Sequence, residues 1–482
     1  MRNNINAGLW MSRIGLGLIF CYCLLASTLY SSFAEIHLTL RFLPFPVFIS
    51  EIVLLICFLL LAWVSKDRKF FTLRTTLLLG LYFGWVGVKA LVNYAYDGPL
   101  TFRNAALFYY PIFSVFAYCF YLRAMLPRNV LMSLAFLAAG IMFFKGMVAW
   151  YWWTYVMLFI VAVWNTRSLQ LRWVGWMFLV VIFLLGPEYF YKGPRAHFVS
   201  VFCAIFFLSF YFGALLLKRH KFVRLGILLA VFLLFILGFF VFADRNAVSS
   251  LISLERIRVV YEERDRLYRG KESSFVPIAI PVQLYHPNEP VLPSSPVPLA
   301  STPKASTPLA SASDVFNNIL HSKIREGRSL TLDENNILFR LFVWRDMARE
   351  LIKEKAFWGF SFGRPQRSRS LEVLNWATEE WSRDGWITPH NSFLHIIYRA
   401  GILGVCLIAI FFFLIGRLVR DFFIMNSTEG GLLVGALVYW LALSNFFVIL
   451  ELPYNAIVFW TLFGLTWVYR DQLKERSVKQ EG

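Results

Sequence analysis

The sequence predicts an all-α membrane protein, a polytopic bundle of about twelve transmembrane helices with one large loop that contains amphipathic helices. Of its 482 residues, 58% are hydrophobic and only 16% are charged, against about 25% charged in soluble domains. Apolar runs of about 20 residues, long enough to cross a ~30 Å hydrocarbon layer, recur along most of the chain. The remaining polar residues concentrate in one stretch, 244–394. These observations exclude an ordinary soluble enzyme.

Each apolar run is expected to form one span. The first follows Arg2 and Arg13 and resembles a signal peptide, but its apolar part exceeds the usual length of about 7 to 15 residues. We therefore expect an uncleaved first helix. The twelve expected spans cover approximately 14–34, 46–64, 75–94, 105–122, 130–147, 149–165, 173–190, 197–217, 222–243, 395–416, 430–450 and 453–469.

The charges predict how these spans are oriented. The net charge is +18, yet the stretch 244–394 holds 20 Lys/Arg against 18 Asp/Glu, so the excess belongs to the membrane-embedded remainder. With a cytoplasmic N-terminus, the inside segments carry 20 Lys/Arg and the short outer loops carry 5. This bias predicts that both termini are cytoplasmic and that 244–394 lies outside. The lipid bilayer, and no nucleic acid, is the expected partner of these charges.

The chain accordingly divides into three parts. Residues 1–243 form spans one to nine, 244–394 form the outer loop, and 395–482 form the last three spans and a cytoplasmic tail. Within the loop, 273–313 holds 9 of the 19 prolines together with many Ser and Ala. That composition cannot bury a core and predicts a flexible insert.

Two amphipathic helices are expected on either side of this insert. One covers Leu251 to Arg269, and the other begins at a possible capping box, Thr331 with Glu334, and runs to about Lys355. On the second helix we expect Ile337, Leu341, Trp344, Ala348 and Leu351 to be packed, and Arg345, Asp346, Arg349, Glu350 and Lys353 to face solvent.

Several chemistries lack support in the sequence. All six cysteines lie in apolar runs, so neither a disulfide framework nor a cysteine metal site is expected. The chain has no HExxH, GxSxG or P-loop motif. We expect no cofactor and no metal site.

His390 is the strongest candidate for a catalytic residue. Thr388 suits a helix N-cap and Pro389 the first helical position, which would set His390 in the first turn of the tenth span. The positive end of the helix dipole would keep the imidazole neutral, as a general base requires. Gly401 and Gly404 would then share its face and allow a close helix approach. The alternative is a polar interfacial histidine that only ends a span.

Basic residues on the outer side are candidate anion ligands. Arg195 and Lys192 lie between the seventh and eighth spans, and the fork of an arginine suits diphosphate oxygens. Arg340 borders the packed stripe of the second loop helix. Each could instead be an interfacial anchor or an ion-pair residue. The same anchoring role is the more common one for Arg103, Lys145, Glu188, Arg399 and Glu451, and Lys89 is expected to snorkel from the third span.

One element resembles a known family. His390-Asn391, nine residues, then Gly401-Ile402-Leu403-Gly404 is similar to the signature of the O-antigen ligase and O-antigen polymerase superfamily. Arg340 with Trp344 four residues on, the turn 357–363 with Gly359, and Arg195 also resemble family elements. The chain departs from the family at Ala356, where Pro is common, and at Ser361, where a second Gly is common.

The resemblance implies a GT-C-like, lipid-carrier-dependent glycosyltransferase in a bacterial inner membrane with its site facing the periplasm. The donor would be an undecaprenyl-diphosphate-linked glycan and the acceptor a hydroxyl of lipid A core or of another glycan, in a metal-independent, inverting reaction. His390 would be the base; Arg195, Arg340, Lys192 and Asn391 would bind diphosphate or substrate. Trp344, Gly359, Gly401 and Gly404 would support the site.

Four other functions stay open at this point. Repeat-unit polymerisation and glycan transfer to protein use the same donor and differ in acceptor. A transporter of lipid-linked glycan would need ionisable groups near mid-span. A scaffold would use the outer helices only as docking surfaces.

Overall fold

The computed structural model is almost entirely helical over the residues that it describes. Its contacts divide the chain into two units, one of Met1–Ser249, Met347–Pro365 and Thr388–Gly482, the other of Ser250–Asp346 and Gln366–Ile387. Each unit is described by itself. The described residues are 2–29, 31–34, 36–39, 47–66, 70–98, 100–124, 149–165, 195–227, 229–230, 233, 261–262, 332–373 and 388–481.

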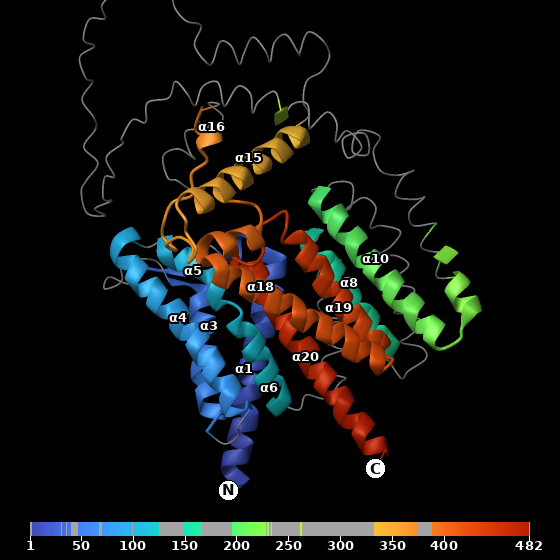
Figure 1. The fold of residues 1–482 in the computed structure, drawn as a ribbon. Helices are drawn as coiled ribbons and strands as arrows, with labels where there is room; N and C mark the ends of the chain where they lie inside the picture. The colour runs from blue at the N-terminus through green and yellow to red at the C-terminus, as the bar shows by residue number, and fades with distance from the viewer. Residues whose placement is uncertain are drawn as a thin grey trace, which may run out of the picture. The chain divides into compact units, whose positions relative to one another are not determined.

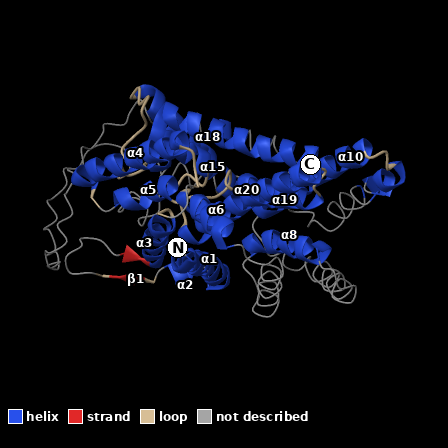
Figure 2. Cartoon of the chain, turned by 90° about the horizontal axis from the view of Figure 1, so that it is seen from below, coloured by secondary structure: helices blue, strands red, loops and turns tan. Residues whose placement is uncertain are grey.

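The first unit holds most of the helices (Figure 1). Its N-terminal part also contains a two-stranded antiparallel sheet in which His37 faces Phe48 and Leu38 faces Val47 (Figure 2). The elements before the second unit are α1 (Arg2–Leu29), α2 (Ser31–Ala34), β1 (His37–Leu38), β2 (Val47–Phe48), α3 (Ile49–Val64), α4 (Leu73–Asp97), α5 (Leu100–Tyr109), α6 (Ile112–Ala124), α8 (Ala149–Asn165) and α10 (Arg195–Lys218).

Three C-terminal helices complete the first unit: α18 (Ser392–Ile424), α19 (Thr428–Leu443) and α20 (Pro453–Glu481). Side-chain caps fix several helix starts, since Thr72 accepts a hydrogen bond from Thr75 N at α4 and Ser427 accepts one from Gly430 N at α19. Helix α1 packs on α3 and α6, α20 packs on α6, and α8 and α10 both pack on α19.

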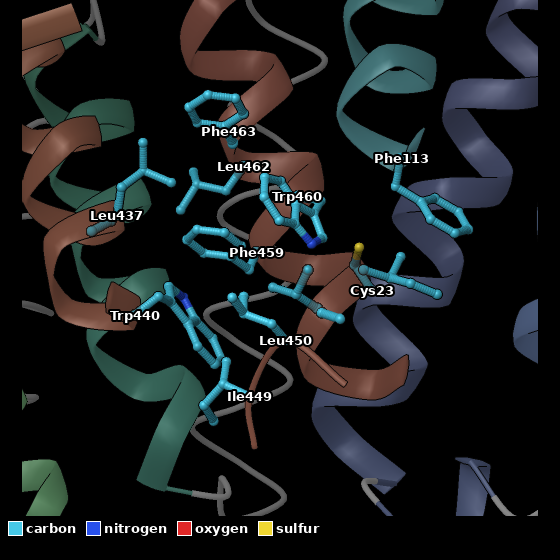
Figure 3. Close-up of a cluster of buried hydrophobic side chains, with 14 of the residues drawn as sticks. Cys23, Phe113, Leu437, Trp440, Ile449, Leu450, Phe459, Trp460, Leu462 and Phe463 are labelled. Atoms are coloured by element: carbon cyan, nitrogen blue, oxygen red, sulfur yellow. The ribbon is translucent and has the colours of Figure 1, made fainter. Parts of the chain in front are cut away.

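An apolar core joins the C-terminal helices to the N-terminal ones (Figure 3). Leu437 and Trp440 of α19 meet aromatic side chains of α20, and Cys23 and Phe113 bring in α1 and α6. Trp440 is fully buried and its indole nitrogen donates to Thr154 of α8 at 2.6 Å. Because lipid is as apolar as these side chains, tight packing and such hydrogen bonds hold the helices together.

The membrane character that the sequence predicts is confirmed, whereas the twelve spans are not. Within the described residues, four helical segments are long and apolar enough to cross a membrane, and a bent pair would make a fifth; α3 and α19 are shorter apolar helices. The lipid-facing character is plainest in α4, because only 11% of the residues in its apolar stretch are buried. The expected spans 130–147, 173–190 and most of 222–243 lie outside the described residues. The four segments are Ala7–Leu29, Leu73–Asp97, Val199–Lys218 and Ser392–Ile424.

Several expected spans differ from the prediction. Residues 105–122 do not form a single helix: Thr101–Tyr109 and Ile112–Ala124 are bent by 42° relative to each other. Pro111 lies at the bend, and a proline removes a backbone donor and clashes with the preceding turn of a helix. The tenth span also extends further than expected, from Ser392 to Ile424.

The second unit is described over part of two helices, α15 (Leu332–Lys353) up to Asp346, and α16 (Arg369–Val373). Asp346 is buried, and its carboxylate accepts hydrogen bonds from the Ser368 hydroxyl at 2.7 Å and from the Ser370 hydroxyl at 2.6 Å. Arg345 donates to the same Ser370 hydroxyl at 2.6 Å. Thr331, the insert 273–313 and most of the helix expected at 251–269 lie outside the described residues.

The expected faces of α15 are wrong in part, although Arg349 and Lys353 are exposed as expected. Its buried residues are Leu338, Phe339, Phe342, Val343, Asp346 and Met347, whereas Ala348, expected to be packed, is exposed. The pattern failed at Asp346 because it assigned this charged residue to solvent. Asp346 is buried since three donors of one short segment satisfy its oxygens.

Candidate functional site

The structure places His390 just before α18 and not within it. Asn391 is the N-cap, and its side chain accepts a hydrogen bond from Leu394 N at 2.9 Å. His390 has a φ of 48°, in the left-handed region. The expectation that Thr388 caps the helix and Pro389 opens it is therefore wrong. Asn is at least as strong an N-cap as Thr. With Asn391 as the cap, the helix begins three residues later than it would with Thr388 as the cap.

The segment around His390 is fastened to the loop that follows α19. Ser392 N donates to Ser444 O at 2.8 Å, and the Ser392 hydroxyl donates to Phe447 O at 3.2 Å. The ring of His390 lies edge-on to the ring of Phe447, with 6.3 Å between centroids. These contacts hold the histidine at a defined position against the end of α19.

Helix α18 is broken at Gly401, whose φ of 57° and ψ of −132° are not helical. The turn 357–360 forms hydrogen bonds with backbone groups of α18 on both sides of the break. Phe360 N donates to Tyr398 O at 2.8 Å, and Ile402 N donates to Phe357 O at 2.8 Å. Because the helix is broken between His390 and the second glycine, the expected alignment of Gly401 and Gly404 on one face with His390 is wrong.

Two glycines make this insertion possible. A Cβ on Gly359 would lie 2.5 Å from Ala400 N, and a Cβ on Gly401 would overlap Phe357 O. Both residues also have positive φ, 71° and 57°, which side chains with a Cβ rarely adopt. Gly404 allows a related approach, since a Cβ there would lie 2.7 Å from Ile396 O. The sequence motifs 357–363 and 401–404 thus form one interlocked structure.

Arg399 is almost fully buried beside the break and binds the same turn. Its Nη1 donates to Ser361 O at 2.5 Å and to Arg364 O at 2.8 Å. Lys89 of α4 donates from Nζ to Arg399 O at 2.5 Å and to Trp358 O at 3.3 Å. Lys89 thus binds one carbonyl at the break of α18 and one in the turn that fills it, contacts that the sequence analysis did not predict.

A histidine that the sequence analysis did not consider completes the array. Arg399 Nε donates to His395 Nε2 at 3.0 Å, and His395 Nδ1 is hydrogen-bonded to Glu451. Since an arginine nitrogen can only donate, Nε2 must accept and the proton must sit on Nδ1, pointing to Glu451. Glu451 and Arg399, expected as interfacial anchors, are thereby joined through a neutral imidazole.

A third cation near the turn is neutralised by carboxylates. Arg364 donates to Glu350 at 2.6 Å and to Glu354 at 2.8 Å, and Tyr398 also donates to Glu350. The hydrogen bond from Arg364 lowers the pKa of Glu354. The pKa of Arg364 is raised: partial burial disfavours its charge, but the hydrogen bond with Glu354 and the charge of Glu350 outweigh burial.

The remaining predicted site residues are only partly placed. Arg195 begins α10 as expected for the start of the eighth span, while Lys192 lies outside the described residues. Arg340 and Trp344 are both half-buried on the part of α15 that belongs to the second unit.

The residues that sequence reasoning missed are His395, Asp97 and Glu350. Asp97 accepts a hydrogen bond from the Ser361 hydroxyl, and Glu350 sits between Arg364 and Tyr398. A signal existed for one of them, because His395 precedes Arg399 by four residues and such pairs are neighbours on a helix. Nothing local indicated that Lys89 or Asp97 would meet the turn, since both are more than 250 residues away along the chain.

No group of three or more His, Cys, Asp or Glu side chains is arranged to hold a metal ion in the described part of the chain. Comparison of the chain with family models, with curated proteins and with solved structures finds no match.

Proposed function

We propose that this protein is an O-antigen ligase-like glycosyltransferase that moves a glycan from undecaprenyl diphosphate to an acceptor hydroxyl, lipid A core being the favoured acceptor. His390 removes the proton from the acceptor hydroxyl while the new bond to the anomeric carbon forms. The diphosphate leaves from the opposite side with the electrons of the broken bond, so the anomeric configuration inverts. Arg195, Arg340, Lys192 and Asn391 bind the substrate and stabilise the developing charge.

One observation supports the proposal: two of the sequence elements of the resemblance, the turn with Gly359 and the element from His390 to Gly404, are in direct contact. The turn around Gly359 inserts at the break at Gly401, and the helical segment on the N-terminal side of that break begins directly after His390-Asn391. A residue held before a short, firmly fixed helix is suited to a reaction that needs a precisely positioned base. Close approach of the two backbone segments requires these glycines. A shared structural role therefore explains the motif better than chance does.

Three further candidates share or replace this chemistry. Polymerisation of repeat units and glycan transfer to protein keep the same donor and the same base, and differ only in acceptor. A transporter of lipid-linked glycan is favoured by one observation, the position of Lys89 and Arg399 within helices long and apolar enough to span a membrane, where ionisable groups often line a path.

The deciding experiment is glycan transfer in proteoliposomes. Purified protein receives undecaprenyl-diphosphate-linked oligosaccharide and either core lipid, a second lipid-linked glycan or an acceptor protein, in the presence of EDTA. We expect product from wild type and at least about a hundredfold less from His390→Ala, because general-base catalysis contributes roughly that much. The acceptor that is used identifies the subclass.

His220→Ala is the matched control. His220 is exposed in the turn that follows α10, so this variant should transfer glycan at the wild-type rate. The thermal unfolding midpoint of each variant in detergent verifies folding. Transfer that persists in a folded His390→Ala variant would contradict the assigned base, and movement of donor between leaflets without any transfer would favour the transporter.

A further inference from the structure

Three large apolar side chains project from the end of α15 and from the turn that fills the break of α18. Ile352, Phe357 and Trp358 are 76%, 69% and 75% exposed. All three belong to the first unit, within Met347–Pro365, and we call them the apolar tip. Single apolar side chains on a surface are common, whereas several gathered at one place indicate an interaction site.

The backbone of the apolar tip is held by two other helices. Phe357 O accepts a hydrogen bond from Ile402 N of α18 at 2.8 Å, and Trp358 O accepts one from Lys89 Nζ of α4 at 3.3 Å. The side chains are therefore exposed on a fixed turn. Lipid offers no partner to a backbone carbonyl, so irregular backbone at membrane depth must find its partners within the protein, as these two carbonyls do.

The contact with Lys89 sets the level of the apolar tip along α4. Lys89 precedes Asp97, the last residue of α4, by eight residues, which corresponds to about 12 Å along the helix axis. The whole of α4 is long and apolar enough to cross a membrane. Trp358 O therefore lies beside the C-terminal half of a candidate membrane span, and not beyond its end.

Exposed apolar side chains lie on either side of the apolar tip. Val88 and Val92 of α4 flank Lys89 and are both exposed, and on α18 Ile402 and Val405 are exposed as well. Lys89 and Ile402 are the residues that bind the backbone of the tip. The lipid that covers the exposed faces of these two helices therefore also reaches the tip.

The charges beside the apolar tip suit the boundary between acyl chains and head groups. Lys353, Glu354 and Lys355 are all exposed. Glu354 is ion-paired with Arg364 at 2.8 Å, while the long side chains of the two lysines can extend to lipid phosphates. Tryptophan is one of the two residue types enriched at that boundary, and Trp358 lies next to these lysines.

We propose that Ile352, Phe357 and Trp358 insert into the lipid leaflet around the C-terminal half of α4, so that the segment 352–358 re-enters the membrane. The partner of this surface is phospholipid: acyl chains contact the three side chains, and head-group phosphates contact Lys353 and Lys355. The proposal does not depend on the glycosyltransferase reaction. It moves into the membrane a part of the stretch 244–394, all of which the sequence analysis expects outside.

Fluorescence quenching of full-length protein in nanodiscs tests the insertion. Single positions are changed to cysteine and labelled with the fluorophore NBD, after the two exposed native cysteines, Cys21 and Cys406, have been replaced by serine. The nanodiscs contain phosphatidylcholine with a nitroxide on its acyl chain, and iodide is the quencher in water. Phe357→Cys and Trp358→Cys should lose emission to the nitroxide as Val92→Cys on α4 does, and should not respond to iodide.

Val478→Cys is the matched control. Val478 is as exposed as Phe357, at 69%, but lies in the polar end of α20. Its label should lose emission to iodide and not to the nitroxide. Protein without an added cysteine gives the background signal, and the thermal unfolding midpoint of each variant verifies folding. Quenching of both tip labels by iodide alone would overturn the proposal, because the tip would then lie in water.

Protection of the tip labels from both quenchers would overturn it too, because a second copy or another protein segment would then cover the tip. A second measurement needs no substitution and decides the matter if the variants fail to fold. Wild type is irradiated in nanodiscs whose phosphatidylcholine carries a diazirine on the acyl chain, and lipid adducts are mapped by mass spectrometry. We expect adducts within 352–358. Adducts on α4 with none in 352–358 would contradict insertion.

Discussion

The two ends of α18 deal with charge in opposite ways. At the C-terminal end, Asp421 is ion-paired with Arg420 at 3.1 Å and with Lys474 at 2.7 Å, so basic groups surround an acid. At the N-terminal end, Arg399 binds carbonyls and a neutral imidazole. The first arrangement is a cluster of direct ion pairs, whereas in the second Glu451, Asp97 and Glu350 stabilise the Arg399 charge without a direct ion pair. Burial of a charge thus requires hydrogen bonds and nearby opposite charge, but not a direct ion pair.

The largest expected difference between the two ends comes from glycine. Gly401→Ala forces a Cβ into Phe357 O at positive φ, and should destabilise the protein by about 3 kcal/mol or more. Gly416→Ala, further along the same helix, meets open space and should be neutral or stabilising by up to about 1 kcal/mol. Denaturant unfolding in mixed micelles measures both. If both substitutions changed the free energy of unfolding equally, the fold would not require the break at Gly401.

A smaller difference is expected from the two carboxylates. Glu451→Ala leaves the buried His395 Nδ1 without its acceptor and should cost about 2 kcal/mol. Asp421→Ala should cost about 1 kcal/mol, although Asp421 is the more deeply buried of the two. Its partners Arg420 and Lys474 are 64% and 43% exposed and can turn to water. The third partner, Arg470, is only 11% exposed but keeps its ion pair with Asp471 at 2.8 Å. The same micelle titration compares the variants. A larger loss at Asp421 would show that burial of the carboxylate matters more than access of its partners to water.

The smallest effect concerns pH at the N-terminal end. The pKa of Glu354 is lowered by Arg364, so the stabilisation that this pair provides is present above the unfolded pKa and is lost as pH falls through the folded one. The unfolding midpoints of wild type and Arg364→Gln should differ at about pH 7 and converge towards about pH 3. A difference that persists at acid pH would assign the role of Arg364 to packing on Phe360, over whose ring its guanidinium lies at 4.2 Å.

Much of the architecture followed from local patterns in the chain. Long apolar runs predicted helices such as α4 and α10, because a membrane leaves the backbone few alternatives. Arg195 was expected at the start of a span, and α10 begins there. Local signals were less successful at helix ends. Both Thr388 and Asn391 can cap a helix, and only the fixed position of Ser392 against Ser444 decides between them.

The sequence by itself determined that this is a helical membrane protein and that His390, Gly359, Gly401 and Gly404 are residues of interest. It could do so because hydrophobicity and motif spacing are local properties. Only the tertiary structure decided that α18 breaks at Gly401, that a turn some 40 residues earlier fills the break, and that Lys89, His395 and Glu451 gather there. Those contacts join distant segments, and their geometry depends on which backbone groups a broken helix exposes, which no periodicity in the sequence encodes.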